Sequence, residues 1–208
     1  MIENFLRPPQ TPAELLADVL RALGVFSVIF AAVFFDPTDA GILAFVLPVV
    51  FAPRFLGSRA GADITLSLTV LVAGWSNVWG LYESVPGWDL AVHFVCTGVL
   101  AASLCLLLGR VQMAPVPRST LATTTLGVTL TTAFGLALSA VWEMVEWVGF
   151  IYVAESISVD YSDTIGDMAA GGLGALCAGL FLMFFGRFDG NRDPAHRTPH
   201  TGPRAAST

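Results

Sequence analysis

The sequence predicts an all-α, polytopic integral membrane protein whose six transmembrane helices form a bundle. Two observations favour this class. Hydrophobic residues make up 55% of the 208 residues and charged residues only 12%, about half the charged share of a soluble domain. The apolar residues also gather in six stretches that polar segments separate. A chain of this composition needs a lipid bilayer as its solvent, and the bilayer is therefore its first expected partner.

The first stretch begins with a helix-start signal. Thr11, Pro12 and Glu14 match a capping box with proline at the first helical position, so we expect the first span over residues 12–35. The other five spans are expected over residues 41–56, 64–82, 89–108, 121–150 and 164–186.

Two of these stretches have features of their own. The second would be only about 24 Å long as a helix, less than the roughly 30 Å of a bilayer core, and it contains Pro48 and Pro53. It is expected to be either a kinked span or a re-entrant loop. In the last stretch Gly171, Ala175 and Gly179 form a small-residue face, which predicts close packing against other helices.

The basic residues predict the orientation in the membrane. If all six stretches cross, every arginine falls on one side, which the positive-inside rule assigns to the cytoplasm; these are Arg7, Arg21, Arg54, Arg59, Arg110, Arg118 and four arginines of the tail. The tryptophans and tyrosines lie toward the opposite ends of the stretches, as an outer interfacial belt would. We therefore expect an inner-membrane protein with a transmembrane domain at residues 1–186, a disordered tail at residues 187–208 and both termini cytoplasmic.

Composition excludes several classes of function. The net charge is −6, which argues against a nucleic-acid partner. The chain has no lysine, so it has no Walker lysine, Schiff-base lysine or lysine phosphate clamp. Cys96, Cys105 and Cys177 are isolated within apolar stretches, and we interpret them as packing residues. No oligomeric state is predicted.

Three polar motifs are expected at one membrane depth, toward the outer ends of the last three spans. Asp89 and His93 are spaced i, i+4, Glu143 and Glu146 are spaced i, i+3, and Asp163 and Asp167 are again spaced i, i+4. Residues at these spacings share one face of a helix. Short connections keep consecutive helices adjacent, so the three motifs should lie close together.

Charge counting favours a metal site for this group. Five carboxylates and one imidazole would share a small volume without an arginine or lysine, and carboxylates so close in a low dielectric cannot all stay ionised. A bound metal, shared protons or a cationic ligand would resolve this. A divalent ion is expected, Mn, Fe or Zn with the imidazole and Mg or Ca with carboxylates alone. The expected ligands are His93, Glu143, Glu146 and Asp167, with Asp89, Asp163 and Ser139 beside them or facing a substrate.

Other interpretations of the same residues remain open. Asp163 fits an N-cap, Asp89 a first-turn acid, and His93 a hydrogen-bonded core histidine. A mostly polar stripe also runs along the fifth span, through Thr125, Thr129, Thr132, Leu136, Ser139, Glu143 and Glu146. Its hydroxyls either bond to helix backbones in packing or line a proton or ion path.

The three motifs together resemble the YjdF-like family of bacterial inner-membrane proteins. That family has acid-x3-His-Phe, Glu-x2-Glu-Trp and Asp-x3-Asp-Met segments before a glycine-rich helix, and here they stand at residues 89–94, 143–147 and 163–168. The resemblance covers about residues 88–179; it implies the topology and the polar site, and it implies no reaction. A looser similarity links the chain to the VanZ-like family, with Glu146 where that family is expected to have glutamine.

Three functions compete at this point. The first is a metal-dependent enzyme acting at the outer leaflet on a lipid or envelope precursor, in which the metal supplies a hydroxide nucleophile and polarises the substrate. The second is a proton- or ion-coupled transporter in which the glutamates titrate. The third is a structural or accessory membrane protein whose polar cluster fixes helix register. A lipid or small molecule is the expected substrate of the enzyme.

Overall fold

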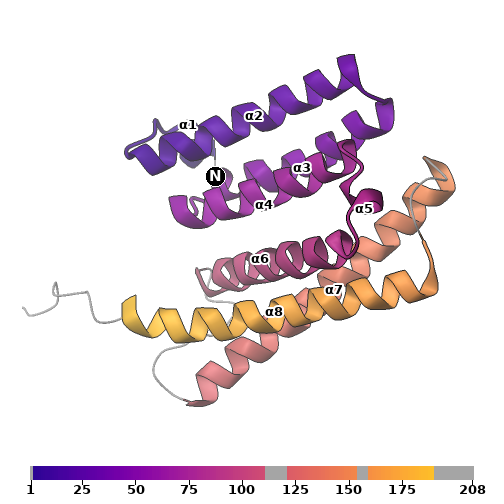
Figure 1. Ribbon diagram of the computed structural model, residues 1–208. Coiled ribbons are helices and arrows are strands. Elements are labelled where there is room, and N and C mark those ends of the chain that lie inside the picture. The colour runs from indigo at the N-terminus through magenta and orange to yellow at the C-terminus, as the bar shows by residue number, and fades with distance from the viewer. Residues whose placement is uncertain (1, 111–120, 154–158, 190–208) are drawn as a thin grey trace, which may run out of the picture.

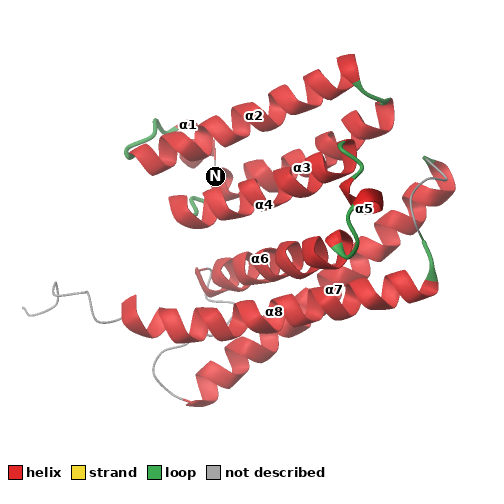
Figure 2. Ribbon diagram, in the orientation of Figure 1, coloured by secondary structure: helices red, strands yellow, loops and turns green. Residues whose placement is uncertain are grey.

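The computed structural model describes residues 2–110, 121–153 and 159–189. Within these residues it contains helices and no strand (Figure 2), which confirms the predicted all-α class. The helices are α1 (Ile2–Leu6), α2 (Pro12–Phe34), α3 (Pro37–Phe55), α4 (Ala60–Val78), α5 (Leu81–Ser84), α6 (Trp88–Arg110), α7 (Leu121–Tyr152) and α8 (Tyr161–Asp189).

The long helices form two groups of three. α2, α3 and α4 pack against one another, and α6, α7 and α8 do the same. The groups meet where α4 contacts α6, and the short α5 connects these two helices at one end (Figure 1). The chain reverses direction at each connection, so the molecule has an α1 end and an α5 end.

Five of the described helices are long and apolar enough to cross a membrane: α2, α3, α6, α7 and α8. They expose many large apolar side chains, among them Leu23, Phe26 and Val33 of α2, as helices in contact with lipid do. α4 is not among the five because buried polar residues lower its hydropathy: Asp63, Ser67 and Ser76 are each less than a tenth exposed.

The helix bounds differ from the predicted spans in places. α3 begins at Pro37 and runs unbroken to Phe55 with Pro48 and Pro53 inside it, so this stretch is a helix of about 28 Å and not a re-entrant loop. α4 ends at Val78, four residues before the predicted bound of 82. It ends there because Gly80 takes a left-handed conformation, with φ 61°, which terminates helices.

The two ends of the chain also differ from expectation. α1 was not predicted; it packs on α3, where the Phe5 ring stacks on Phe55 with centroids 4.5 Å apart. Thr11 caps α2 as predicted and accepts a hydrogen bond from the Glu14 backbone N–H at 3.2 Å. The Glu14 carboxylate accepts from the Gln10 backbone N–H, not from Thr11. α8 continues to Asp189, and the rest of the predicted tail lies outside the described residues.

Each group has its own kind of packing. In the first, Val50, Leu66, Val70 and Leu71 form an apolar cluster. In the second, small residues let α8 approach α6 and α7 closely. A Cβ placed on Gly98 would lie 2.8 Å from the Gly174 carbonyl oxygen, and Ala175 is 0% exposed. The predicted small-residue face of α8 is therefore confirmed.

Candidate metal centre

Three helices bring the predicted polar motifs together at the α5 end. Asp89 and His93 lie near the start of α6, Glu143 and Glu146 toward the end of α7, and Asp167 near the start of α8. Because α8 packs against both α6 and α7, these five side chains converge. Their potential ligand atoms form two groups in which all atoms lie within 4.8 Å of one another, Asp89–His93–Asp167 and His93–Glu143–Glu146.

His93 belongs to both groups because its two ring nitrogens face different carboxylates. Nε2 lies 3.5 Å from Asp89 Oδ1 and 4.0 Å from Asp167 Oδ2, and Nδ1 lies 4.0 Å from Glu143 Oε1. When a histidine binds a metal through one nitrogen, the other usually donates its N–H to a carboxylate. In this geometry Nδ1 could bind a metal beside Glu143 while the Nε2 N–H is donated to Asp89.

Two buried carboxylate oxygens in this cluster lack a hydrogen-bond partner. They are Glu143 Oε1 and Asp167 Oδ1, and Asp167 as a whole is only 2% exposed. An unpartnered polar atom in a buried site is costly, and one that bears charge is more costly still. A cation, a water molecule or a proton on one of the carboxylates would supply the missing partner.

The donor set fits a divalent metal ion. Ligand atoms that each lie about 2.1 Å from one ion are separated by about 3 to 4.2 Å, close to the separations between His93 and its carboxylate neighbours. Imidazole nitrogen with carboxylate oxygens suits Mn, Fe or Zn. The arginines whose ion pairs are described, Arg7, Arg21 and Arg54, pair at the α1 end instead.

The residues predicted beside the ligands have different surroundings. Ser139 is 1% exposed, and its hydroxyl donates to the Asp167 backbone oxygen at 3.4 Å, so it joins α7 to α8 beside the cluster. Asp163 is half-buried in the first turn of α8 and belongs to neither group. Because α8 begins at Tyr161, Asp163 lies inside the helix, and the interpretation of Asp163 as its N-cap was wrong.

The residue before α8 takes the capping position instead. The Asp160 carboxylate accepts a hydrogen bond from the Tyr161 backbone N–H at 2.8 Å and another from the Ser162 hydroxyl. These bonds, the Ser162 one foremost, hold the pKa of Asp160 below its usual value. Asp160 and Asp163 are equally good capping residues, so the sequence does not tell where the first turn begins.

Two aromatic residues near the cluster were not predicted as part of it. Trp88 Nε1, next to Asp89 in the chain, is a buried donor without a hydrogen-bond partner. Tyr82 of α5 donates to the Ala73 backbone oxygen at 2.9 Å, and burial raises its pKa. Tyr82 thus stays neutral and holds α5 against α4. In the sequence both residues fit the outer interfacial belt, and nothing in it indicates that they lie near the cluster.

The polar stripe of α7 favours the packing interpretation. The Thr132 hydroxyl donates to the Val128 backbone oxygen at 2.9 Å, and Ser139 bonds across to α8 as described above. Thr125, Thr129 and Leu136 are exposed on the surface of the chain, so the stripe is not enclosed along its length. A continuous path within one chain therefore finds no support in this arrangement.

Comparison with known proteins gives one match. A family model described as "Predicted membrane protein (DUF2238)" matches residues 19–187, which include all three polar motifs. No curated protein and no solved structure matches the chain. The similarity to the VanZ-like family finds no support in these comparisons.

Proposed function

Because the chain belongs to the DUF2238 family of membrane proteins, we propose that it is a multi-pass protein of the cell inner membrane with six spans and both termini cytoplasmic. Five described helices have the length and apolar character of a span. α4 is the sixth in this proposal, because an ion pair with Arg21 offsets the charge of its buried Asp63. The arginines at the α1 end support a cytoplasmic location of that side, because the positive-inside rule predicts arginines on the cytoplasmic face.

We further infer that this family is the YjdF-like one. The matched residues, 19–187, contain the acid-x3-His-Phe, Glu-x2-Glu-Trp and Asp-x3-Asp-Met segments on which the resemblance rests. The structure supports this inference by another route, since side chains from all three segments lie within one cluster.

At the α5 end we propose a divalent metal site. One observation supports it above the others: Glu143 Oε1 and Asp167 Oδ1 are buried without a hydrogen-bond partner, and both carboxylates face the His93 imidazole. His93 through Nδ1, Glu143 and Glu146 would hold the ion, and Asp167, which lies on the Nε2 side of the ring, would become the fourth ligand after a shift of its side chain. Asp89 would accept a hydrogen bond from the His93 ring nitrogen that the ion does not use, and would thereby fix the orientation of the ring.

The activity that suits such a site best is metal-dependent chemistry on a lipid or envelope precursor at the outer leaflet. A bound divalent ion would supply Lewis acidity there and lower the pKa of a coordinated water. The protein residues hold the ion and orient His93. Asp89 is about one third exposed, which leaves one side of the cluster accessible to a substrate.

Elemental analysis and melting of the purified protein test the metal site. We expect a stoichiometric divalent ion in the native protein and its loss in Glu143→Gln and Asp167→Asn. Chelator should lower the melting temperature of the native protein, since an ion that binds only the folded state stabilises it by about 2.7 kcal/mol at one hundred times Kd. Glu83→Gln is the matched control, because Glu83 is an exposed carboxylate of α5 at the same end; it should keep the ion.

Protonated carboxylates predict the opposite results. Removing a carboxylate would then relieve repulsion, and Glu143→Gln would melt higher than the native protein. A metal-free native protein that is insensitive to chelator and is stabilised by Glu143→Gln would exclude the proposed site.

A further inference from the structure

We propose that the cavity between α1, α2 and α3 binds a phosphate group, supplied by the headgroup of an anionic phospholipid or by a free phosphate compound. The cavity lies at the α1 end, far from the proposed metal site. It has a volume of about 380 Å³, within the range of about 300–1,000 Å³ that is usual for ligand pockets. Its lining is part basic and part apolar: Phe5, Arg7, Pro9, Asp18, Arg21, Ala22, Val25, Phe51 and Arg54.

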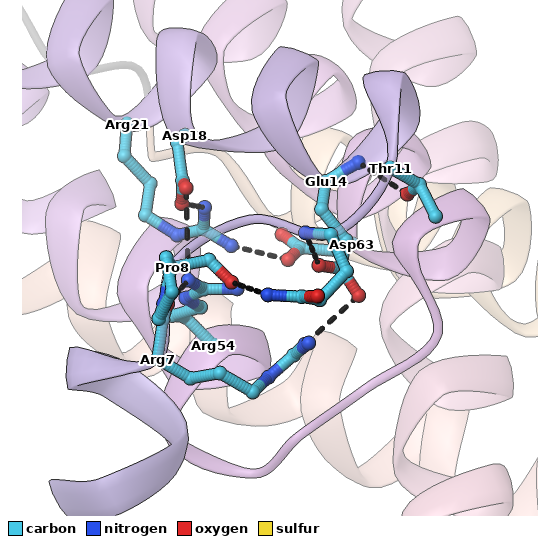
Figure 3. Close-up of polar contacts among 9 residues, drawn as sticks. Arg7, Pro8, Thr11, Glu14, Asp18, Arg21, Arg54 and Asp63 are labelled. Atoms are coloured by element: carbon cyan, nitrogen blue, oxygen red, sulfur yellow. Dashed lines mark hydrogen bonds and ion pairs between the residues drawn. The ribbon is translucent and has the colours of Figure 1, made fainter.

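Three arginines from different parts of the chain converge on this cavity (Figure 3). Arg7 follows α1, Arg21 belongs to α2 and Arg54 to α3. Asp18 is the one acidic residue that lines the cavity in the described part of the chain. Two further carboxylates beside the lining also pair with these arginines, Glu14 with Arg7 and Asp63 with Arg21. Arginine clusters of this kind recognise phosphate, because the planar guanidinium binds two phosphate oxygens at once.

Hydrogen bonds and ion pairs within the protein hold the arginines in place, and they do not use all of the guanidinium N–H donors. Arg21 donates from Nη1 to Asp18 at 2.6 Å and from Nη2 to Asp63. Its Nε has no hydrogen-bond partner although the residue is only 4% exposed. Arg54 donates to the Arg7 backbone oxygen and lies 3.6 Å from Asp18. A guanidinium has five N–H donors, so these contacts orient the arginines and do not exhaust them.

The apolar part of the lining favours a lipid as the source of the phosphate. Val25 lies one turn beyond Arg21 on α2, and both Ala22 and Val25 are exposed on the surface of the helix. Phe51 lies one turn before Arg54 on α3, which runs antiparallel to α2, so it lies on the same side of the arginines as Val25. A molecule with its phosphate at the arginines would therefore have apolar side chains beside whatever extends along the helices. An acyl chain would pack against these apolar side chains, whereas an inorganic phosphate ion would make no contact with them.

Melting of the full-length protein in detergent tests the proposal. The probes are phosphatidylglycerol, phosphatidylcholine as the lipid with no net charge, and inorganic phosphate. At about one hundred times Kd we expect phosphatidylglycerol to raise the melting temperature by about 5 °C or more, and phosphatidylcholine to give little change. A rise with inorganic phosphate as large as that with phosphatidylglycerol would identify a free phosphate compound as the ligand, and no such rise would identify the lipid.

Three variants link the effect to this cavity. Arg7→Gln removes a basic group that is 44% exposed, so the fold should tolerate it. Ala22→Phe fills the cavity without removing a charge. Both should abolish most of the rise. Arg59→Gln is the matched control, since Arg59 is exposed at the same end and does not line the cavity; it should keep the rise.

The absence of a rise with both phosphatidylglycerol and inorganic phosphate would overturn the proposal, and so would two other results. One is an equal response to both lipids with none to inorganic phosphate. The other is a response to phosphatidylglycerol or phosphate that persists in both Arg7→Gln and Ala22→Phe, because the anion would then bind elsewhere on the protein.

Discussion

At the scale of single residues, the ion pair between Arg21 and Asp63 joins α2 to α4 in the buried part of the α1 end. The two side chains are 5% and 6% exposed, and the Ser67 hydroxyl donates a further hydrogen bond to Asp63 at 3.4 Å. A buried pair contributes little net stability, because desolvation offsets the attraction. Removing only one of the two charges is strongly destabilising, since the remaining charge stays buried without its partner.

We therefore expect Arg21→Gln to lower the free energy of unfolding by about 3–5 kcal/mol. The double variant Arg21→Gln/Asp63→Asn should recover part of this loss, because no buried charge is then left alone. Denaturant unfolding of both variants measures the coupling. Arg59→Gln should stay within about 0.5 kcal/mol of the native protein, as exposed substitutions do. Simple additivity of Arg21→Gln and Asp63→Asn would contradict the pairing.

At this scale, the spacing of residues along one helix predicts which side chains lie side by side. Spacing placed Asp89 beside His93 and Glu143 beside Glu146, and the structure gathers both pairs around one imidazole. Spacing did not find the pair of Arg21 with Asp63, because the partners are 42 residues apart and nothing local links them. Arg21 instead resembled an interfacial residue near the start of its span.

At the scale of elements, the close packing of α8 against α6 and α7 depends on its glycines, which have no side chain. Its glycines lie where α6 and α7 pass closest, and a Cβ on Gly171 would lie 2.7 Å from the Ser139 hydroxyl oxygen and 2.9 Å from that of Thr97. The same helix places Asp167 in the polar cluster. The close approach of the helices and the geometry of the cluster are thus coupled.

Gly174→Ala should destabilise the protein by about 1–3 kcal/mol, because the added methyl group would overlap the backbone of Phe94 in α6. Gly166→Ala is the control in the same helix. Its Cβ would meet only the Leu90 side chain, at 3.5 Å, and alanine favours helix by up to about 1 kcal/mol. Thermal melting of the two variants should give shifts of opposite sign, and equal destabilisation would show that the packing argument is wrong.

Most elements could be predicted from hydrophobic patterning, because a long apolar run in a membrane protein has few alternatives to a helix. The exceptions were set by individual residues. The end of α4 depends on the positive φ of Gly80, and α1 depends on Phe5 packing against Phe51 and Phe55 of a helix far away in the chain. Neither cause is visible in the composition of the segment itself.

At the scale of the whole molecule, each three-helix group holds one cluster of charged residues, and the two clusters are built in the same pattern. The residues of the two charged clusters lie near the start of the first and third helices and near the end of the second: Asp18 and Arg21, Arg54, and Asp63 in one group; Asp89 and His93, Glu143 and Glu146, and Asp167 in the other. Each group has three long helices, so the second group starts at the opposite end from the first. The two charged clusters therefore lie at opposite ends of the molecule.

The proposed orientation predicts which end is accessible from outside the cell. In a background without Cys96, Cys105 and Cys177, single cysteines at Asp36 or Ser84 should react with an impermeant thiol reagent in intact cells. A cysteine at Ser58 should react only after the cells are opened. Asp36 precedes α3 and Ser84 ends α5, whereas Ser58 follows α3. Labelling of Ser58 in intact cells would refute the crossing of α3.

The apolar cluster of Val50, Leu66, Val70 and Leu71 is also a dielectric barrier. It extends through Val99 and Leu100 to the middle of α6, and so lies between the arginines of one end and the carboxylates of the other. A charged side chain in such a layer costs at least about 2.5–3.5 kcal/mol. This cost opposes the passage of an ion or a proton from one charged end to the other through the layer in this conformation.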